Sequence, residues 1–130
     1  MDAKTLVMAL LRASGPSKEL DRDIAIFSGY TVRTDTKPGE EFWTSPSQVD
    51  FLNLPKFTAS IDAAFDLFKQ TSPAYPGGLS WEAQSASARL ADDRFMQAES
   101  PALALCASVV LRLALSQYAD STVLPRAEEL

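Results

Sequence analysis

Two pairs of carboxylates are the residues whose type and spacing best suit chemistry. Asp62 and Asp66 stand four residues apart and therefore share one face of a helix, which suits a Mg²⁺ ion or a small hydrolase. Asp92 and Asp93 are adjacent, as in many turns. A structural role is favoured for both pairs, since Asp62 falls in the first turn of a predicted helix, where negative charge complements the dipole. A hydrolase that uses Asp62 and Asp66 stays an alternative hypothesis.

The other groups that commonly carry catalysis are absent or poorly placed. The chain has no histidine, so the commonest general base and metal ligand is missing. Its single cysteine, Cys106, lies in an apolar segment, where a thiol behaves as a small hydrophobe. The glycines at 77 and 78 lack the Lys-Ser/Thr ending of a phosphate loop. The sequence therefore predicts a protein that is not an enzyme and uses no cofactor and no metal ion.

Charge and aromatic content bear on nucleic-acid binding. The chain has 12 Lys and Arg residues among 17 Asp and Glu residues, for a net charge of −5. Because non-specific binding to DNA or RNA depends on clustered cations, direct nucleic-acid binding is disfavoured. A small nucleic-acid-binding module that uses Arg89 and Arg94 stays an alternative. Core packing is favoured over base stacking for the aromatic residues Tyr30, Phe42, Trp43 and Trp81.

The length fits one domain over residues 1–130, with an ordered core at about 3–118 and a frayed tail at about 120–130. The first apolar run is broken by Arg12 and does not resemble a signal peptide. Ser108 and Arg112 interrupt the C-terminal apolar segment, which predicts a core helix rather than a membrane span. We expect a cytoplasmic protein that does not contact the membrane.

Three helices are predicted before residue 72. The first covers 3–13 and ends at Ser14-Gly15-Pro16, with Gly15 as a left-handed cap. Ser17 is the N-cap of the second, and Gly29 closes it. Together they form a helical hairpin. The third begins at the N-cap Thr58 and ends near Gln70.

Between the second and third helices, residues 30–57 have aromatic anchors but no clean period, which predicts an ordered loop with short strands at 30–33 and 42–44. Residues 71–78 are loop-like in composition. Alternation then predicts strands at 79–84, 86–90 and 95–98. Trp81 is expected to point inward beside Leu79. Short connections make these three strands an antiparallel meander.

The C-terminal helix begins at the N-cap Ser100 and has almost no polar face. Such a helix is normally buried, which favours a position between the sheet and the N-terminal hairpin. The alternative is that its spare face binds a partner or a second copy of the chain. The candidate interface is the strip formed by Leu105, Val109 and Leu113 beside Arg112. The predicted fold is α+β: a helical hairpin, a third helix, a three-stranded antiparallel meander and a long C-terminal helix packed on the sheet.

Several segments resemble the phage ABA-sandwich domain family, small proteins of phages and prophages without an assigned activity. The most specific blocks are 57–64 and 100–106; the others are 14–21, 24–25, 29–30, 42–43, 79–81 and 88–90. The resemblance spans roughly residues 5 to 116, and the connection from Phe65 to Leu79 is longer than is usual in the family. It implies helix and sheet layers and transfers no catalytic residue.

Together these observations favour a non-enzymatic phage or prophage accessory protein that binds a host protein. One concrete version is an inhibitor of a bacterial defence nuclease, similar to an anti-CRISPR protein, whose acidic surface enters a basic nucleic-acid channel. A homodimer is an alternative assembly.

Overall fold

A helix that is apolar on nearly every side lies at the centre of the computed structural model, which describes residues 2–33 and 37–121, with side chains as far as Gln117. The helices are α1 (Ala3–Arg12), α2 (Lys18–Phe27), α3 (Ile61–Thr71) and α4 (Pro101–Ser121). The strands are β1 (Thr31–Arg33), β2 (Phe42–Thr44), β3 (Asp50–Leu52), β4 (Gly77–Trp81), β5 (Ala86–Leu90) and β6 (Met96–Ala98). The fold is α+β.

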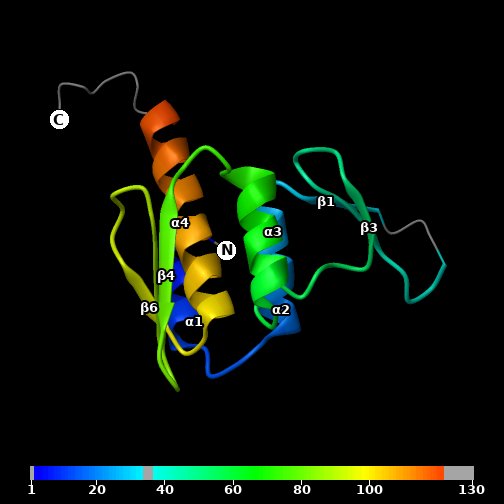
Figure 1. Cartoon of the computed structure of the whole chain (residues 1–130). Coiled ribbons are helices and arrows are strands. Elements are labelled where there is room, and N and C mark those ends of the chain that lie inside the picture. Colours follow the sequence, from blue (N-terminus) through cyan, green and yellow to red (C-terminus); the bar gives the residue numbers. More distant parts are fainter. Residues whose placement is uncertain (1, 34–36, 122–130) are drawn as a thin grey trace.

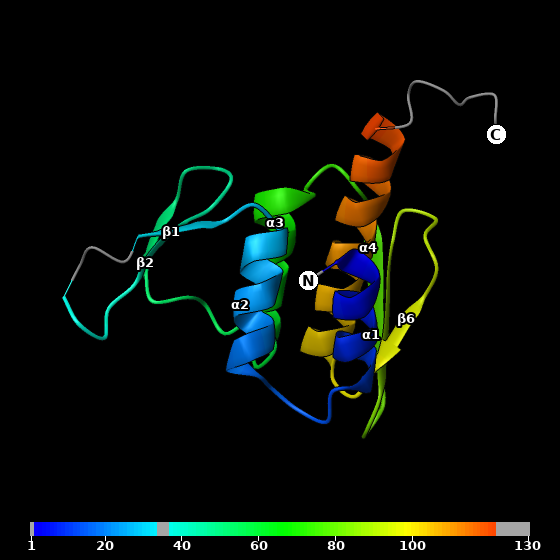
Figure 2. The ribbon, with the colours of Figure 1, turned by 180° about the vertical axis from the view of Figure 1, so that it is seen from behind.

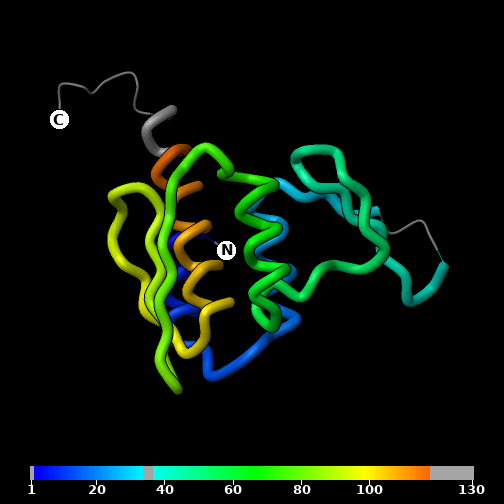
Figure 3. The backbone as a smooth tube through the Cα atoms, in the orientation of Figure 1, coloured from blue at the N-terminus to red at the C-terminus, as the bar shows by residue number. Residues whose placement is uncertain are grey.

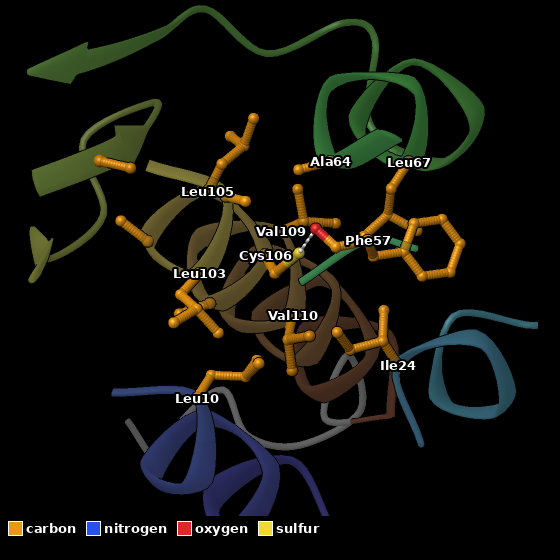
Figure 4. Packing of buried hydrophobic residues seen from close by; sticks show 14 of the residues in the cluster. Leu10, Ile24, Phe57, Ala64, Leu67, Leu103, Leu105, Cys106, Val109 and Val110 are labelled. Atoms are coloured by element: carbon orange, nitrogen blue, oxygen red, sulfur yellow. Dashed lines mark hydrogen bonds between the residues drawn. The ribbon is translucent and has the colours of Figure 1, made fainter. Parts of the chain in front are cut away.

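The layers around α4 explain its composition. The sheet β4-β5-β6 covers one side of α4, α1 lies beside it, and α3 and α2 cover the opposite side (Figures 1 and 2). Every residue from 102 to 110 is buried. In Figure 4, Leu103 and Val110 lie toward Leu10 of α1, while Val109 lies near Ala64 of α3. The prediction that α4 packs on the sheet is confirmed. The predicted cover by the N-terminal hairpin is wrong in part, because α3 is the main cover opposite the sheet, while α1 lies next to β6 and α2 lies with α3.

A second sheet, in the order β1-β2-β3, occupies the region predicted to be a loop. The chain leaves α2, forms this antiparallel sheet and returns to α3 (Figure 3). Trp43 of β2 is fully buried, and the indole N–H of this residue donates to Glu41 Oε1 at 3.3 Å. Arg22 of α2 forms an ion pair with the same carboxylate at 2.9 Å. The short strands predicted at 30–33 and 42–44 are confirmed as β1 and β2. The third strand, β3, was not predicted, because its pairing with β2, rather than any local period, defines it.

The helix ends test the predicted caps. Ser17 and Ser100 are N-caps, and their hydroxyls accept from the N–H groups of residues 20 and 103. Gly29 has φ +94° and closes α2 as predicted. Gly15 is not a left-handed cap, because α1 stops at Arg12 and the next residue is extended. Thr58 does not cap α3, because its side chain bonds to α2; Ser60 is the N-cap.

The meander is confirmed with shifted boundaries. The first strand starts at Gly77 and stops at Trp81, whose side chain is 68% exposed rather than packed inward. Trp81 pairs with Ala86 at the end of the sheet. The last strand begins at Met96, which leaves Phe95 outside it and 60% exposed. The predicted frayed tail falls mostly outside the described residues, and α4 runs to Ser121.

Candidate functional site

A buried polar junction joins the start of α2, the segment that leads into α3, and α4. Thr58 donates its N–H and its hydroxyl to Asp21 Oδ1, at 2.8 and 2.7 Å. The Thr58 hydroxyl oxygen also accepts from the N–H of Ser17 at 2.9 Å. Burial raises the pKa of Asp21, and the hydrogen bonds from Thr58 oppose this shift. The junction fixes the start of α2 against the segment that leads into α3.

Cys106 completes the junction from α4. Its thiol donates to the carbonyl of Phe57 at 3.4 Å (Figure 4), and the residue has no exposed surface. Burial raises the pKa of the thiol, which keeps it protonated and unreactive. These blocks of sequence therefore hold the fold together, and they present no nucleophile to solvent.

The structure does not bring the predicted carboxylates together into a site. Asp62 is exposed and Asp66 is half-buried on α3. Asp93 accepts from Arg112 at 3.0 Å and is committed to that ion pair, whereas Asp92 is exposed. Within the described residues, no group of three or more His, Cys, Asp or Glu side chains could hold a metal ion.

The aromatic residues and arginines considered for nucleic-acid binding are scattered. Trp43 and Tyr30 are buried by the first sheet, whereas Trp81 belongs to the second. The Arg89 guanidinium lies 4.4 Å from the centre of the Phe95 ring. These positions do not form one stacking platform.

The predicted interface strip on α4 is mostly core. Val109 is fully buried and Leu105 is 7% exposed, because α3 and the sheet close over this part of the helix. Leu113 is half-buried. Arg112 is held between Asp93 and the ring of Tyr75, 4.8 Å from the ring centre. The expectation that this strip is a free surface is wrong for Leu105 and Val109, and Arg112 is already paired.

The open apolar surface of α4 lies on a different face of the helix, at Leu111, Ala114 and Leu115. A groove of about 840 Å³ runs between α1, α4 and the start of β6; we call it the α1–α4 groove. Its exposed apolar side chains are Phe95, 60% exposed, and Leu115, 39% exposed. The remaining lining residues are Ala3, Lys4, Val7, Met8, Leu11, Arg94, Met96, Gln97, Leu111 and Ala114.

The charges on this groove are basic, although the whole chain carries −5. Lys4 and Arg94 are both exposed. Neither forms an ion pair with another residue in the part of the chain that the structure describes. The groove therefore combines an apolar lining with two cations at its rim, a surface suited to an apolar segment that carries acidic residues.

Sequence reasoning missed this groove because three distant segments form it. Phe95 was predicted to lie in a strand, and Leu115 was not singled out on α4. One signal was available: Met8 adds an apolar residue outside the stripe of α1 that faces the core. An apolar residue outside the core-facing stripe of a helix indicates a second contact surface.

In comparisons with known proteins, no protein-family model, no curated protein and no solved structure matches this chain. Across residues 2–33 and 37–121, no helix is both long enough and apolar enough to span a membrane.

Proposed function

We propose that this protein is a non-enzymatic binding protein that docks another protein in the α1–α4 groove. The family resemblance supports a phage or prophage accessory protein whose partner is a host protein in the cytoplasm. One concrete version inhibits a bacterial defence nuclease: the groove anchors the protein, and acidic surface elsewhere faces the basic nucleic-acid channel.

The observation that carries the proposal is the exposure of Phe95 and Leu115 over an otherwise apolar groove. Burying apolar surface contributes about 25 cal/mol per Å², so a partner that covers both side chains gains binding free energy. Large aromatic side chains in pockets at the centre of an interface often dominate its affinity. Phe95 is the aromatic residue of the groove and is 60% exposed, so a partner can cover its ring.

The partner segment that fits is apolar with acidic residues at its edges. Such a segment buries its apolar side chains on the lining and pairs its carboxylates with Lys4 and Arg94. Rim charges mainly change association rates and their salt dependence, so binding is expected to weaken as ionic strength rises.

The test is capture of host proteins by three tagged forms of the chain. These are the wild type, the groove double variant Phe95→Ser/Leu115→Ser, and the control Ile26→Ser, which changes a 55% exposed apolar residue on α2. We expect a host protein that the wild type and the control retain equally and that the groove variant loses about tenfold or more. Equal capture by all three forms, or no host protein retained by the wild type, contradicts the proposal.

A further inference from the structure

A second binding surface lies along β4, which is an edge strand in the order β4-β5-β6. The edge of a sheet presents backbone N–H and C=O groups that can pair with another chain. Proteins commonly protect such edges with charged residues or proline within the strand. The five residues of β4, Gly-Gly-Leu-Ser-Trp, include neither.

The hydrogen bonds that flank β4 identify the groups on its outer edge. The N–H of Ala91 donates to the carbonyl of Pro76 at 2.7 Å, and the N–H of Glu82 donates to the carbonyl of Ser85 at 2.8 Å. In an antiparallel pair, only alternate residues bond to the partner strand. Residues 76, 78, 80 and 82 therefore bond toward β5. The backbone groups of residues 77, 79 and 81 point to the open edge.

A groove beside this edge has apolar lining residues that an added strand would contact. It has a volume of about 300 Å³ and is lined by β4 and α3, with α4 between these two elements in Figures 1 and 3. Leu79 lines one side, and Ile61 and Phe65 of α3, 40% and 50% exposed, line the other. Leu90 and Leu105 also line it. A strand added to β4 places alternate side chains against the exposed face of α3.

We propose that this β4–α3 groove binds an extended segment of another protein by strand addition, with apolar residues on its inner face and at least one basic residue. The apolar residues cover Phe65 and Leu79. The basic residue pairs with Asp62, which lines the groove, or lies over the exposed ring of Trp81 at the end of β4. Backbone pairing supplies affinity, and alternate side chains supply specificity. This surface is separate from the α1–α4 groove and does not depend on the function proposed for it.

A foreign segment fits this edge better than a second copy of the chain. A second copy would bring acidic charge to this edge, because each chain carries a net charge of −5 and Asp62 is the charged residue that lines the groove. Like charges opposed across an interface weaken association. A basic extended segment meets the same rim with opposite charge.

The probe is a library of random ten-residue peptides selected on the full-length protein, from which the tightest binder is synthesised. Amide hydrogen exchange is then measured with and without this peptide. We expect binding to slow exchange at Leu79 and Trp81, whose N–H groups face the open edge, and to change Ser80 little, because its N–H already bonds to β5. Unchanged exchange at Leu79 and Trp81, or no selected peptide, overturns the proposal.

Two matched comparisons distinguish strand addition from non-specific hydrophobic binding. N-methylation of one alternating set of peptide residues should weaken binding about tenfold, and methylation of the other set should have little effect. Phe65→Ser should also weaken binding about tenfold, whereas Phe95→Ser in the other groove should not. Equal loss with both methylation sets, or a β4-mediated dimer that already protects Leu79, contradicts the proposal.

Discussion

At the scale of single residues, the Asp21–Thr58 junction is the polar contact on which the fold depends most. Thr58 is 1% exposed and gives two hydrogen bonds to one carboxylate oxygen. A carboxylate buried with fewer partners destabilises the folded state, because it has lost its water and gains little in exchange.

Thr58→Val keeps the shape of the side chain but removes its hydroxyl. We expect the free energy of unfolding to fall by about 2–4 kcal/mol, since Asp21 loses a charge-assisted hydrogen bond in a buried site. Urea denaturation followed by circular dichroism measures this change. The control is Thr44→Val, whose hydroxyl donates to Asp50 on the surface at 2.8 Å; it should cost less than about 1 kcal/mol. Equal losses of unfolding free energy in both variants would show that the buried junction contributes no more to stability than the surface hydrogen bond does.

The raised pKa of Asp21 makes a prediction about pH. Burial is the main cause, so the folded state binds this proton more readily than the unfolded state does. The contribution to stability is therefore complete below the unfolded pKa, about 3.9, and is lost as pH rises through the raised folded pKa. Asp21→Asn keeps an acceptor for Thr58 but does not titrate.

Unfolding free energies of the wild type and Asp21→Asn, measured from pH 3 to pH 7, check this sign. We expect the difference between them to shift in favour of the variant as pH rises. A difference that is constant with pH, or one that shifts in favour of the wild type, would contradict the assignment.

At the scale of elements, β4 tests how tightly the sheet is packed. A Cβ atom at Gly77 would lie 2.6 Å from Leu90 Cδ2 and 3.1 Å from the carbonyl oxygen of Arg89. At Gly78 it would meet nothing within 4 Å. Glycine is therefore required at the first position for packing, and at the second it is not.

Gly77→Ala should lower the free energy of unfolding by about 1–3 kcal/mol, because Leu90 is buried and the Arg89 carbonyl belongs to the paired strand. Gly78→Ala, one residue away, should change it by less than about 0.5 kcal/mol. Thermal or urea unfolding of the two variants makes the comparison. If Gly78→Ala lowers the free energy of unfolding as much as Gly77→Ala does, the loss comes from replacing glycine in the strand and not from the contact with Leu90.

The sequence predicts the elements that have both a period and a cap. Ser100 and a continuous apolar run define α4, and Ser17 and Gly29 define α2. It fails where distant partners decide the outcome. Strand β3 has three residues and exists through its pairing with β2, and Thr58 leaves its predicted cap position because Asp21 offers a buried acceptor.

At the scale of the whole molecule, the central position of α4 explains which part of this helix is buried and which part lines a groove. The sheet, α1 and α3 cover residues 102–110 of α4, so Leu105 and Val109 become core. Further along α4, Leu111 and Leu115 line the α1–α4 groove. Neither groove could be predicted from the sequence, because each is lined by segments that meet only in the folded chain.

Photo-crosslinking in host cells shows whether another protein occupies the α1–α4 groove. Phe95 is replaced in one form by p-benzoylphenylalanine, and Ile26, equally open but on α2, is replaced in another. We expect ultraviolet light to produce a discrete adduct with a host protein from position 95 and not from position 26. The same adducts from both positions, or no adduct from position 95, would contradict this proposal.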